Sequence, residues 1–140
     1  MSVYLDASVL LPTLIDEPGS NAVERFLASV EEGFVISDFA AEEVASGLSR
    51  LVRTRLITSD VAVKRLSIFD AWRADEGQAV DMETADFRAA SAIVRRFELM
   101  LRAPDALHIA VCRRLDARLA TLDVRLAEAA NALGVRIAPL

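Results

Sequence analysis

Residues 3–11 read VYLDASVLL, and this stretch decides much of the fold. Its side chains are all apolar or small except those of Asp6 and Ser8. The first three residues are typical of a buried strand, and the residues after Asp6 favour the start of a helix. An unpaired carboxylate is expensive to bury, so Asp6 is expected to have a partner. Identifying that partner is the main question that the sequence raises.

Length and composition predict one globular domain over residues 1–140, because 54% of the residues are hydrophobic and 26% are charged. No apolar run is long enough to span a membrane, and the N-terminus lacks the pattern of a signal peptide. Cys112 is the only cysteine, which excludes an intrachain disulfide and a thiolate zinc site. These features predict a cytoplasmic protein.

Charge is unevenly distributed along the chain, although the net charge is only −5. Residues 1–49 hold nine acids and one base, whereas residues 50–140 hold fifteen bases and twelve acids. A basic segment begins at Arg50 and includes Arg53 and Arg55. These arginines are candidates for contacts with phosphates of a nucleic acid, because a local basic patch can bind phosphate on an acidic protein. A solvated helical face explains them equally well.

Short apolar runs alternate with longer amphipathic segments, which predicts βαβ units and a parallel sheet covered on both faces. The expected strands are 3–5, 34–36, 79–80, 118–121 and 135–137. The expected helices are 20–32, 38–55, 59–72, 84–97, one beginning at Pro104 and one ending at Gly134. The expected caps are Ser20, Asp38, Thr58 or Ser59, and Thr84.

Four acidic residues are expected at one edge of this sheet. Ligands of parallel α/β sheets bind beyond the carboxyl ends of the strands, where the helices also begin. Asp6 and Asp123 follow predicted strands, whereas Asp105 and Glu43 lie near the starts of predicted helices. Each has a simpler explanation, since Asp6, Asp105 and Asp123 could stabilise helix N-termini. Glu43 is favoured over Glu42 because it flanks the apolar stripe of its helix.

A cluster of four carboxylates would repel and should raise at least one pKa, unless a divalent cation is bound. Oxygen ligands suit Mg²⁺ or Mn²⁺, and such an ion can activate water for phosphoryl transfer. Ser8 and Thr121 could support the carboxylates or a water, although a helix cap and a strand residue explain them as well. His108 is expected to be a neutral, partly buried histidine, because no second histidine completes a metal site or a triad.

Four motifs together resemble the PIN-domain family, in its branch of VapC-like toxins. They are YLDASVLL at 4–11, EVASGL at 43–48, RAPDALHIAVCRRL at 102–115 and LATLDVRLAEAANALGV at 119–135. The resemblance implies a three-layer α/β/α fold with a five-stranded parallel sheet. It also implies a ribonuclease that depends on Mg²⁺ or Mn²⁺ and uses Asp6, Glu43, Asp105 and Asp123. The implied partners are RNA, a small cognate antitoxin and a second copy of the chain.

Two other functions are considered. A haloacid-dehalogenase-like phosphatase would use a nucleophilic aspartate with a second aspartate two residues later. That second position is Ser8 in this chain, which argues against such an enzyme. The other alternative is a binding module that keeps the fold without the reaction, and the presence of all four acids argues against the loss of catalysis.

Overall fold

A computed structural model describes all residues, 1–140, and contains a parallel sheet of four strands. The strand order is β3-β2-β1-β4, so the first strand of the chain lies inside the sheet. Tyr4 pairs with Val35 of β2 on one side and with Leu119 of β4 on the other. The strands are β1 Val3–Leu5, β2 Phe34–Ser37, β3 Gly77–Val80 and β4 Arg118–Ala120.

The expected fifth strand at residues 135–137 is wrong. Only Ile137 forms a parallel bridge, with Leu119 of β4. Two backbone hydrogen bonds flank the bridge, from the Leu119 amide to Arg136 and from the Ala138 amide to Leu119, each 2.8 Å long. β4 offers only three residues for pairing, and Pro139 restricts the backbone just beyond the bridge. The segment therefore touches the edge of the sheet without becoming a strand of it.

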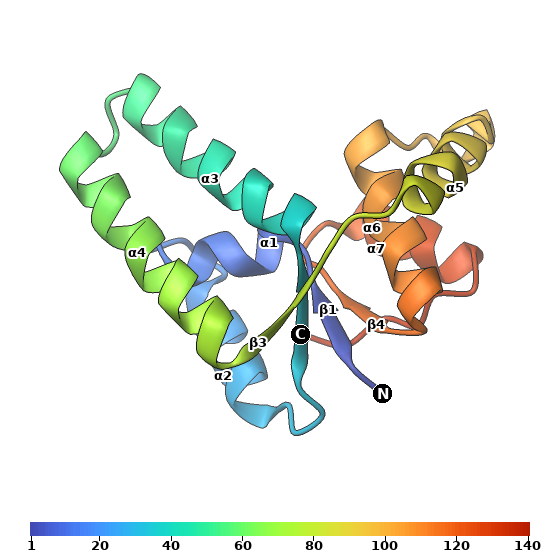
Figure 1. The fold of residues 1–140 in the computed structure, drawn as a ribbon, viewed down its shortest axis with the longest axis horizontal. Coiled ribbons are helices and arrows are strands. Elements are labelled where there is room, and N and C mark those ends of the chain that lie inside the picture. The colour runs from blue at the N-terminus through green and yellow to red at the C-terminus, as the bar shows by residue number, and fades with distance from the viewer.

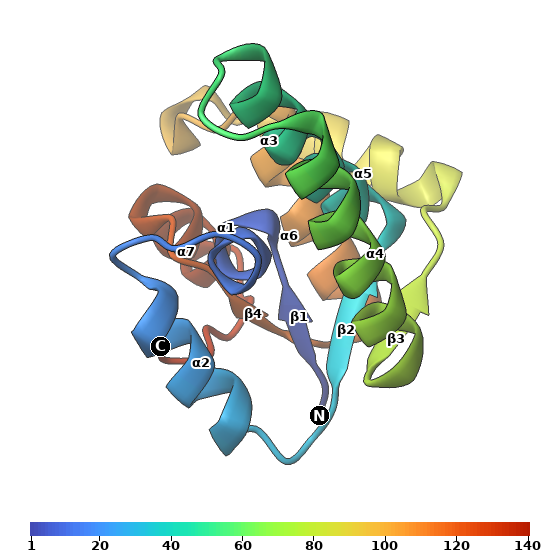
Figure 2. The same cartoon turned by 90° about the vertical axis from the view of Figure 1, so that its left-hand side faces the viewer.

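Helices cover both faces of the sheet, which confirms the α/β/α layering (Figures 1 and 2). They are α1 Ala7–Leu10, α2 Ser20–Ser29, α3 Asp38–Arg53, α4 Ser59–Asp75, α5 Thr84–Val94, α6 Ala103–Leu115 and α7 Val124–Ala132, with short 3-10 helices η1 Leu11–Thr13 and η2 Phe97–Leu99. No helix combines the length and the apolar character needed to cross a membrane.

Several helix boundaries differ from the expected ones because the capping residues differ. Ser37, not Asp38, caps α3 by accepting a hydrogen bond from the Ala40 amide. Glu83, not Thr84, precedes α5, and its amide donates a hydrogen bond to Oδ2 of Asp86 at 2.9 Å. Gly19, not Ser20, is the N-cap residue of α2.

The helix expected to begin at Pro104 begins at Ala103, and the one expected to end at Gly134 ends at Ala132. The bounds of β2, β3 and β4 differ from the expected ones by one or two residues. The helices predicted to end at 32, 55 and 97 end at residues 29, 53 and 94, and α4 extends to residue 75.

The alternation of side chains along the strands divides the interior into two cores. Val3 and Leu5 of β1 pack with α1, α2, α3 and α4, whereas Tyr4 packs with α5, α6 and α7. Cys112 is buried in this second core, and burial raises the pKa of its thiol well above the usual range. Both views show the α3–α4 hairpin extending beyond the carboxyl ends of the strands (Figures 1 and 2).

Candidate active site

Asp6 lies where β1 ends, and its carboxylate is held entirely by neutral donors. The side chain is 3% exposed and caps α1. Oδ1 accepts hydrogen bonds from the Ser8 hydroxyl at 2.6 Å and the Val9 amide at 3.2 Å. Oδ2 accepts one from the Thr121 hydroxyl at 2.5 Å. Burial raises the pKa of Asp6, although these hydrogen bonds act to lower it. No basic side chain forms an ion pair with Asp6.

Ser8 and Thr121 join the end of β1 to the loop after β4. Ser8 accepts a hydrogen bond from the Leu122 amide at 2.8 Å, and Thr121 accepts one from the Asp123 amide at 3.0 Å. Neither has the ordinary role considered from the sequence, since Asp6 caps α1 and Thr121 lies one residue beyond β4. Both hydroxyls instead support the Asp6 carboxylate.

Asp105 and Asp123 both act on helix N-termini, and each uses only one oxygen to do so. Oδ2 of Asp105 accepts a hydrogen bond from the Arg102 amide at 3.2 Å, in the first turn of α6. Oδ1 of Asp123 accepts one from the Leu126 amide at 3.1 Å and caps α7. The ordinary explanation is therefore correct for both residues, but it leaves the second oxygen of each without a donor from the protein.

Glu43 points inward from α3, while Glu42 beside it is exposed, as the helical-face argument expects. Oε2 of Glu43 lies 2.6 Å from Nε2 of His108, and the Glu43 side chain is 27% exposed. His108 lies three residues after Asp105 on α6. This contact brings the second turns of α3 and α6 together at the edge of the sheet where Asp6 lies.

His108 and Tyr4 are the site residues that sequence reasoning missed. The histidine is buried more deeply than expected, and both of its ring nitrogens make hydrogen bonds. Nδ1 lies 2.7 Å from the hydroxyl of Tyr4 on β1. The available signals were that His108 is the only histidine and that it lies one helical turn from Asp105.

The tight cluster of four carboxylates expected from the sequence does not form. No three Asp, Glu, His or Cys side chains lie close enough together to hold a metal ion by themselves. The pKa of Asp6 is raised by burial rather than by the neighbouring carboxylates. The structure links Asp6 to Asp123 through Thr121, and it links Glu43 to α6 through His108.

The free carboxylate oxygens nevertheless suit a divalent cation as ligands. A carboxylate oxygen can accept about two hydrogen bonds, and Oδ2 of Asp6 accepts only one. Oε1 of Glu43, Oδ1 of Asp105 and Oδ2 of Asp123 accept none from the protein. Mg²⁺ is typically bound by one or two carboxylates, with water and substrate phosphate completing its coordination. An oxygen-only set of this kind suits Mg²⁺ or Mn²⁺.

The arginines of the basic segment lie at the far end of α3. All three are exposed. Arg53 donates a hydrogen bond to the Ser49 hydroxyl at 2.7 Å, whereas Arg50 and Arg55 form no ion pair. Arg55 follows the helix with a left-handed backbone, at a φ of 61°. The three side chains are therefore free of carboxylate partners on the hairpin that extends beyond the sheet (Figure 1).

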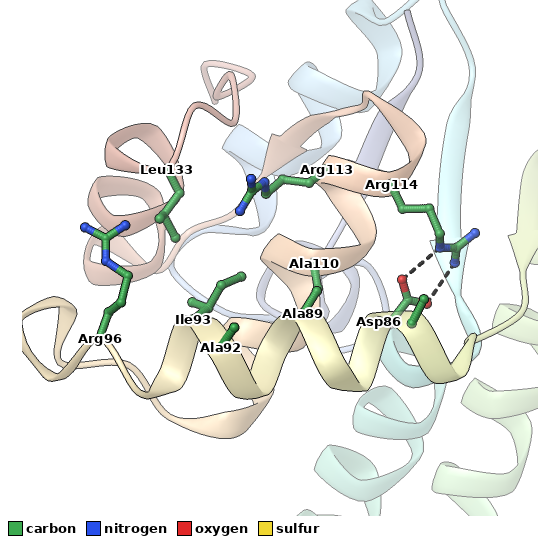
Figure 3. Close-up of a pocket in the computed structure, with 10 residues that line it drawn as sticks. Asp86, Ala89, Ala92, Ile93, Arg96, Ala110, Arg113, Arg114 and Leu133 are labelled. Atoms are coloured by element: carbon green, nitrogen blue, oxygen red, sulfur yellow. Dashed lines mark hydrogen bonds and ion pairs between the residues drawn. The ribbon is translucent and has the colours of Figure 1, made fainter.

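A separate hollow in the surface lies between α5, α6 and α7 (Figure 3). Its volume is about 610 Å³, and none of the four acids lines it. At its edge, Arg114 holds Asp86 with hydrogen bonds of 2.8 and 2.9 Å. Burial acts to raise the pKa of Asp86, but Arg114 and the Glu83 amide lower it overall. This ion pair joins α5 to α6 and has no part in the acidic edge.

The family model of the PIN domain matches residues 3–132. The chain belongs to the PIN domain family. Ribonuclease VapC3 of Pyrobaculum aerophilum is 28% identical over 133 residues, which cover 95% of this chain and 98% of that protein.

Solved structures of VapC proteins have the same fold. VapC20 of Mycobacterium tuberculosis, described as a toxin that cleaves the sarcin-ricin loop, superposes with a TM-score of 0.73 at 18% identity, over 98% of this chain and 99% of that one. The DNA-bound VapBC of Salmonella typhimurium gives a TM-score of 0.70 at 16% identity, over 99% of this chain and 97% of that one. These similarities show the architecture of this PIN domain.

Proposed function

We propose that this PIN domain is an endoribonuclease that depends on Mg²⁺ or Mn²⁺ and hydrolyses RNA phosphodiester bonds. Asp6, Glu43, Asp105 and Asp123 are its metal-binding acids, supported by Ser8 and Thr121. The family membership and the similarity to a protein named as a ribonuclease support this function. A phosphatase of the haloacid-dehalogenase type is disfavoured, because this is a PIN domain and Ser8 stands where the second aspartate would be.

The environment of Asp6 is the observation that carries the proposal. The carboxylate of a residue that is only 3% exposed is strongly disfavoured in its charged form unless an opposite charge or enough donors stabilise it. Asp6 has three neutral donors and one acceptor position left on Oδ2. A divalent cation at that position would supply the missing positive charge.

The remaining groups then have defined tasks. When bound, the divalent ion would polarise the phosphoryl oxygen and lower the pKa of a bound water. Asp105 and Asp123 offer their second oxygens at the starts of α6 and α7. Those helix N-termini also carry partial positive charge, which favours a phosphate group nearby. Ser8 and Thr121 hold Asp6 in one orientation throughout the reaction.

Sequencing RNA ends after the chain is expressed in a bacterial host tests this function. The wild-type chain should produce new ends at defined positions, whereas Asp6→Asn should lower their yield by at least about 100-fold, since it removes a ligand charge. Asp70→Asn is the matched control, because Asp70 is exposed on α4. Wild-type cleavage by a folded Asp6→Asn variant would reject the metal mechanism, whereas a folded wild-type chain that produces no new RNA ends would favour a binding module.

We further propose that a small cognate antitoxin holds this protein inactive, in a hetero-oligomer that contains a homodimer of this chain. One similar structure is described as a toxin–antitoxin complex from Klebsiella pneumoniae, and another as VapBC2 of Rickettsia felis bound to a DNA fragment of its promoter. Expression of this chain alone should arrest growth, and co-expression of any short reading frame found adjacent to its gene should relieve the arrest. Continued arrest, with both proteins present, would argue against that partner.

A further inference from the structure

A buried chain of hydrogen bonds runs from Glu43 through α6 and β1 to the start of α3. His108 Nε2 lies 2.6 Å from Glu43 Oε2, and His108 Nδ1 lies 2.7 Å from the Tyr4 hydroxyl. The Tyr4 hydroxyl in turn lies 2.7 Å from the Ser37 hydroxyl. Tyr4 and Ser37 are fully buried, and His108 is 3% exposed. This series of hydrogen bonds thus begins and ends at α3, because Ser37 caps that helix.

Only one arrangement of hydrogens satisfies every group in this series of hydrogen bonds. An ionised Glu43 can only accept, so Nε2 of His108 must carry a hydrogen. If Nδ1 accepts from Tyr4, the Tyr4 oxygen accepts from the Ser37 hydroxyl, and Ser37 accepts from the Ala40 amide. With a hydrogen on Nδ1, His108 would donate to the Tyr4 oxygen and the Tyr4 hydroxyl would donate to Ser37. The buried Ser37 hydroxyl hydrogen would then have no acceptor. The neutral Nε2–H form of His108 therefore fits the structure.

The ring of His108 is also held sterically. Its centroid lies 5.6 Å from that of Tyr4, in an edge arrangement, and 5.1 Å from that of Phe39. A ring packed on two sides and bonded through both nitrogens cannot turn freely. Its Nε2–H group is therefore a rigid donor for Glu43, a side chain that would otherwise sample many rotamers.

We propose that His108 is the positioning residue for Glu43, whose carboxylate it fixes through Oε2 so that Oε1 remains available to the divalent ion. Tyr4 supports His108 by holding its second nitrogen. The inference rests on the proposed function, because it takes Glu43 to be a metal-binding acid. Residues that orient metal ligands in this way commonly change metal affinity or activity 10- to 100-fold when they are replaced.

Nuclear magnetic resonance tests the contact without any activity or metal. His108 is the only histidine, so its ring gives a single set of nitrogen signals in the full chain. At neutral pH, one nitrogen should be protonated and one unprotonated, with the hydrogen on Nε2. Glu43→Gln should shift the Nε2 signal, whereas Glu42→Gln should leave it unchanged. A hydrogen on Nδ1, or a spectrum that Glu43→Gln does not alter, would overturn the proposal.

Two substitutions of His108 separate positioning from packing. His108→Gln can place an amide donor near the position of Nε2 and keep the contact with Glu43. His108→Asn reaches only to the position of Nδ1 and loses that contact. Both variants lose the ring packing, which unfolding measurements should show as similar losses of stability. His108→Asn should raise the Mn²⁺ concentration for half-maximal cleavage about 10- to 100-fold, and His108→Gln should restore most of the loss.

The Glu43→Gln background provides the last control. If His108 acts only through Glu43, His108→Asn should cause no further loss of cleavage in that background. Equal metal dependence of the Gln and Asn variants, or additive losses with Glu43→Gln, would overturn the positioning role. A wild-type chain without ribonuclease activity would instead reject the proposed function, while the nitrogen spectra would still decide whether His108 holds Glu43.

Discussion

At the scale of single residues, Asp6 combines deep burial with hydrogen bonds from neutral groups alone. The sequence predicted where Asp6 would lie, because an acid directly after a buried strand must reach the edge of the sheet. It did not predict the donors, since Thr121 is separated from Asp6 by 115 residues. The same limit applies to His108 and Tyr4, which are 104 residues apart. Long-range pairs of this kind depend on packing that local patterns do not describe.

The Thr121 hydroxyl can be tested by an isosteric substitution. Thr121→Val removes the only protein donor to Oδ2 of Asp6 and should lower the free energy of unfolding by about 1–3 kcal/mol. It should also lower the rate of RNA cleavage, because Asp6 is then less firmly held. Thr121→Ser keeps the hydroxyl and is the control. Denaturant unfolding and cleavage assays on both variants measure the two effects, and equal stability of the two would contradict this role.

At the scale of helices and strands, the boundaries of the elements were harder to predict than their presence. The expected cap at Asp38 was wrong by one residue, because Ser37 remains in β2 and still caps α3 through its side chain. Asp38 then pairs with Arg73 of α4 at 2.8 Å. Two adjacent residues with good capping side chains cannot be ranked from sequence, since the choice depends on where the strand stops pairing.

The contact between α5 and α6 yields a prediction about pH. The pKa of Asp86 is lowered in the folded chain, so its ion pair with Arg114 contributes stability above the ordinary aspartate pKa of about 4. That contribution is lost as the pH falls through the lower, folded-state pKa. Asp86→Asn should therefore cost about 1–3 kcal/mol at pH 7 and progressively less in acid.

Urea unfolding at several pH values measures this difference. Asp81→Asn is a suitable control, because Asp81 is exposed and contacts Arg114 only through its backbone carbonyl. A loss of stability for Asp86→Asn that stays constant down to pH 2 would show that the charge of Asp86 is not the cause.

At the scale of the whole molecule, the layered architecture was predicted correctly and the number of strands was not. Residues 135–137 are apolar enough for a strand, but only Ile137 bridges to the short strand β4. Composition cannot reveal how many residues of a segment will pair, because that number depends on the length of the neighbouring strand. The family resemblance implied the same incorrect number of strands, while the order of the other helices and strands followed from the alternation of segments.

The uneven distribution of charge leads to a prediction about RNA binding, based on the hypothesis that Arg50, Arg53 and Arg55 contact phosphates. Replacing all three with Gln should weaken binding and reduce the slope of log affinity against log salt by about 2, or roughly 0.7 for each lost contact. Filter binding at several salt concentrations measures both quantities.

A variant with the same change in charge provides the control for this experiment. Arg25, Arg88 and Arg95 are also exposed, and they form no ion pair. Replacing these three with Gln removes equal charge from α2, from α5 and from the residue that follows α5. If the two triple variants show the same salt slope, the hairpin has no special role on the RNA path.

The single cysteine has a practical consequence for all of these measurements. Cys112 is 1% exposed, and burial keeps its thiol protonated. A thiol-reactive dye should therefore label only molecules whose second core has opened. Its labelling rate under native conditions would report the free energy of that opening for each variant, without denaturant and without an engineered label. The wild-type chain thus carries its own reporter of rare unfolding.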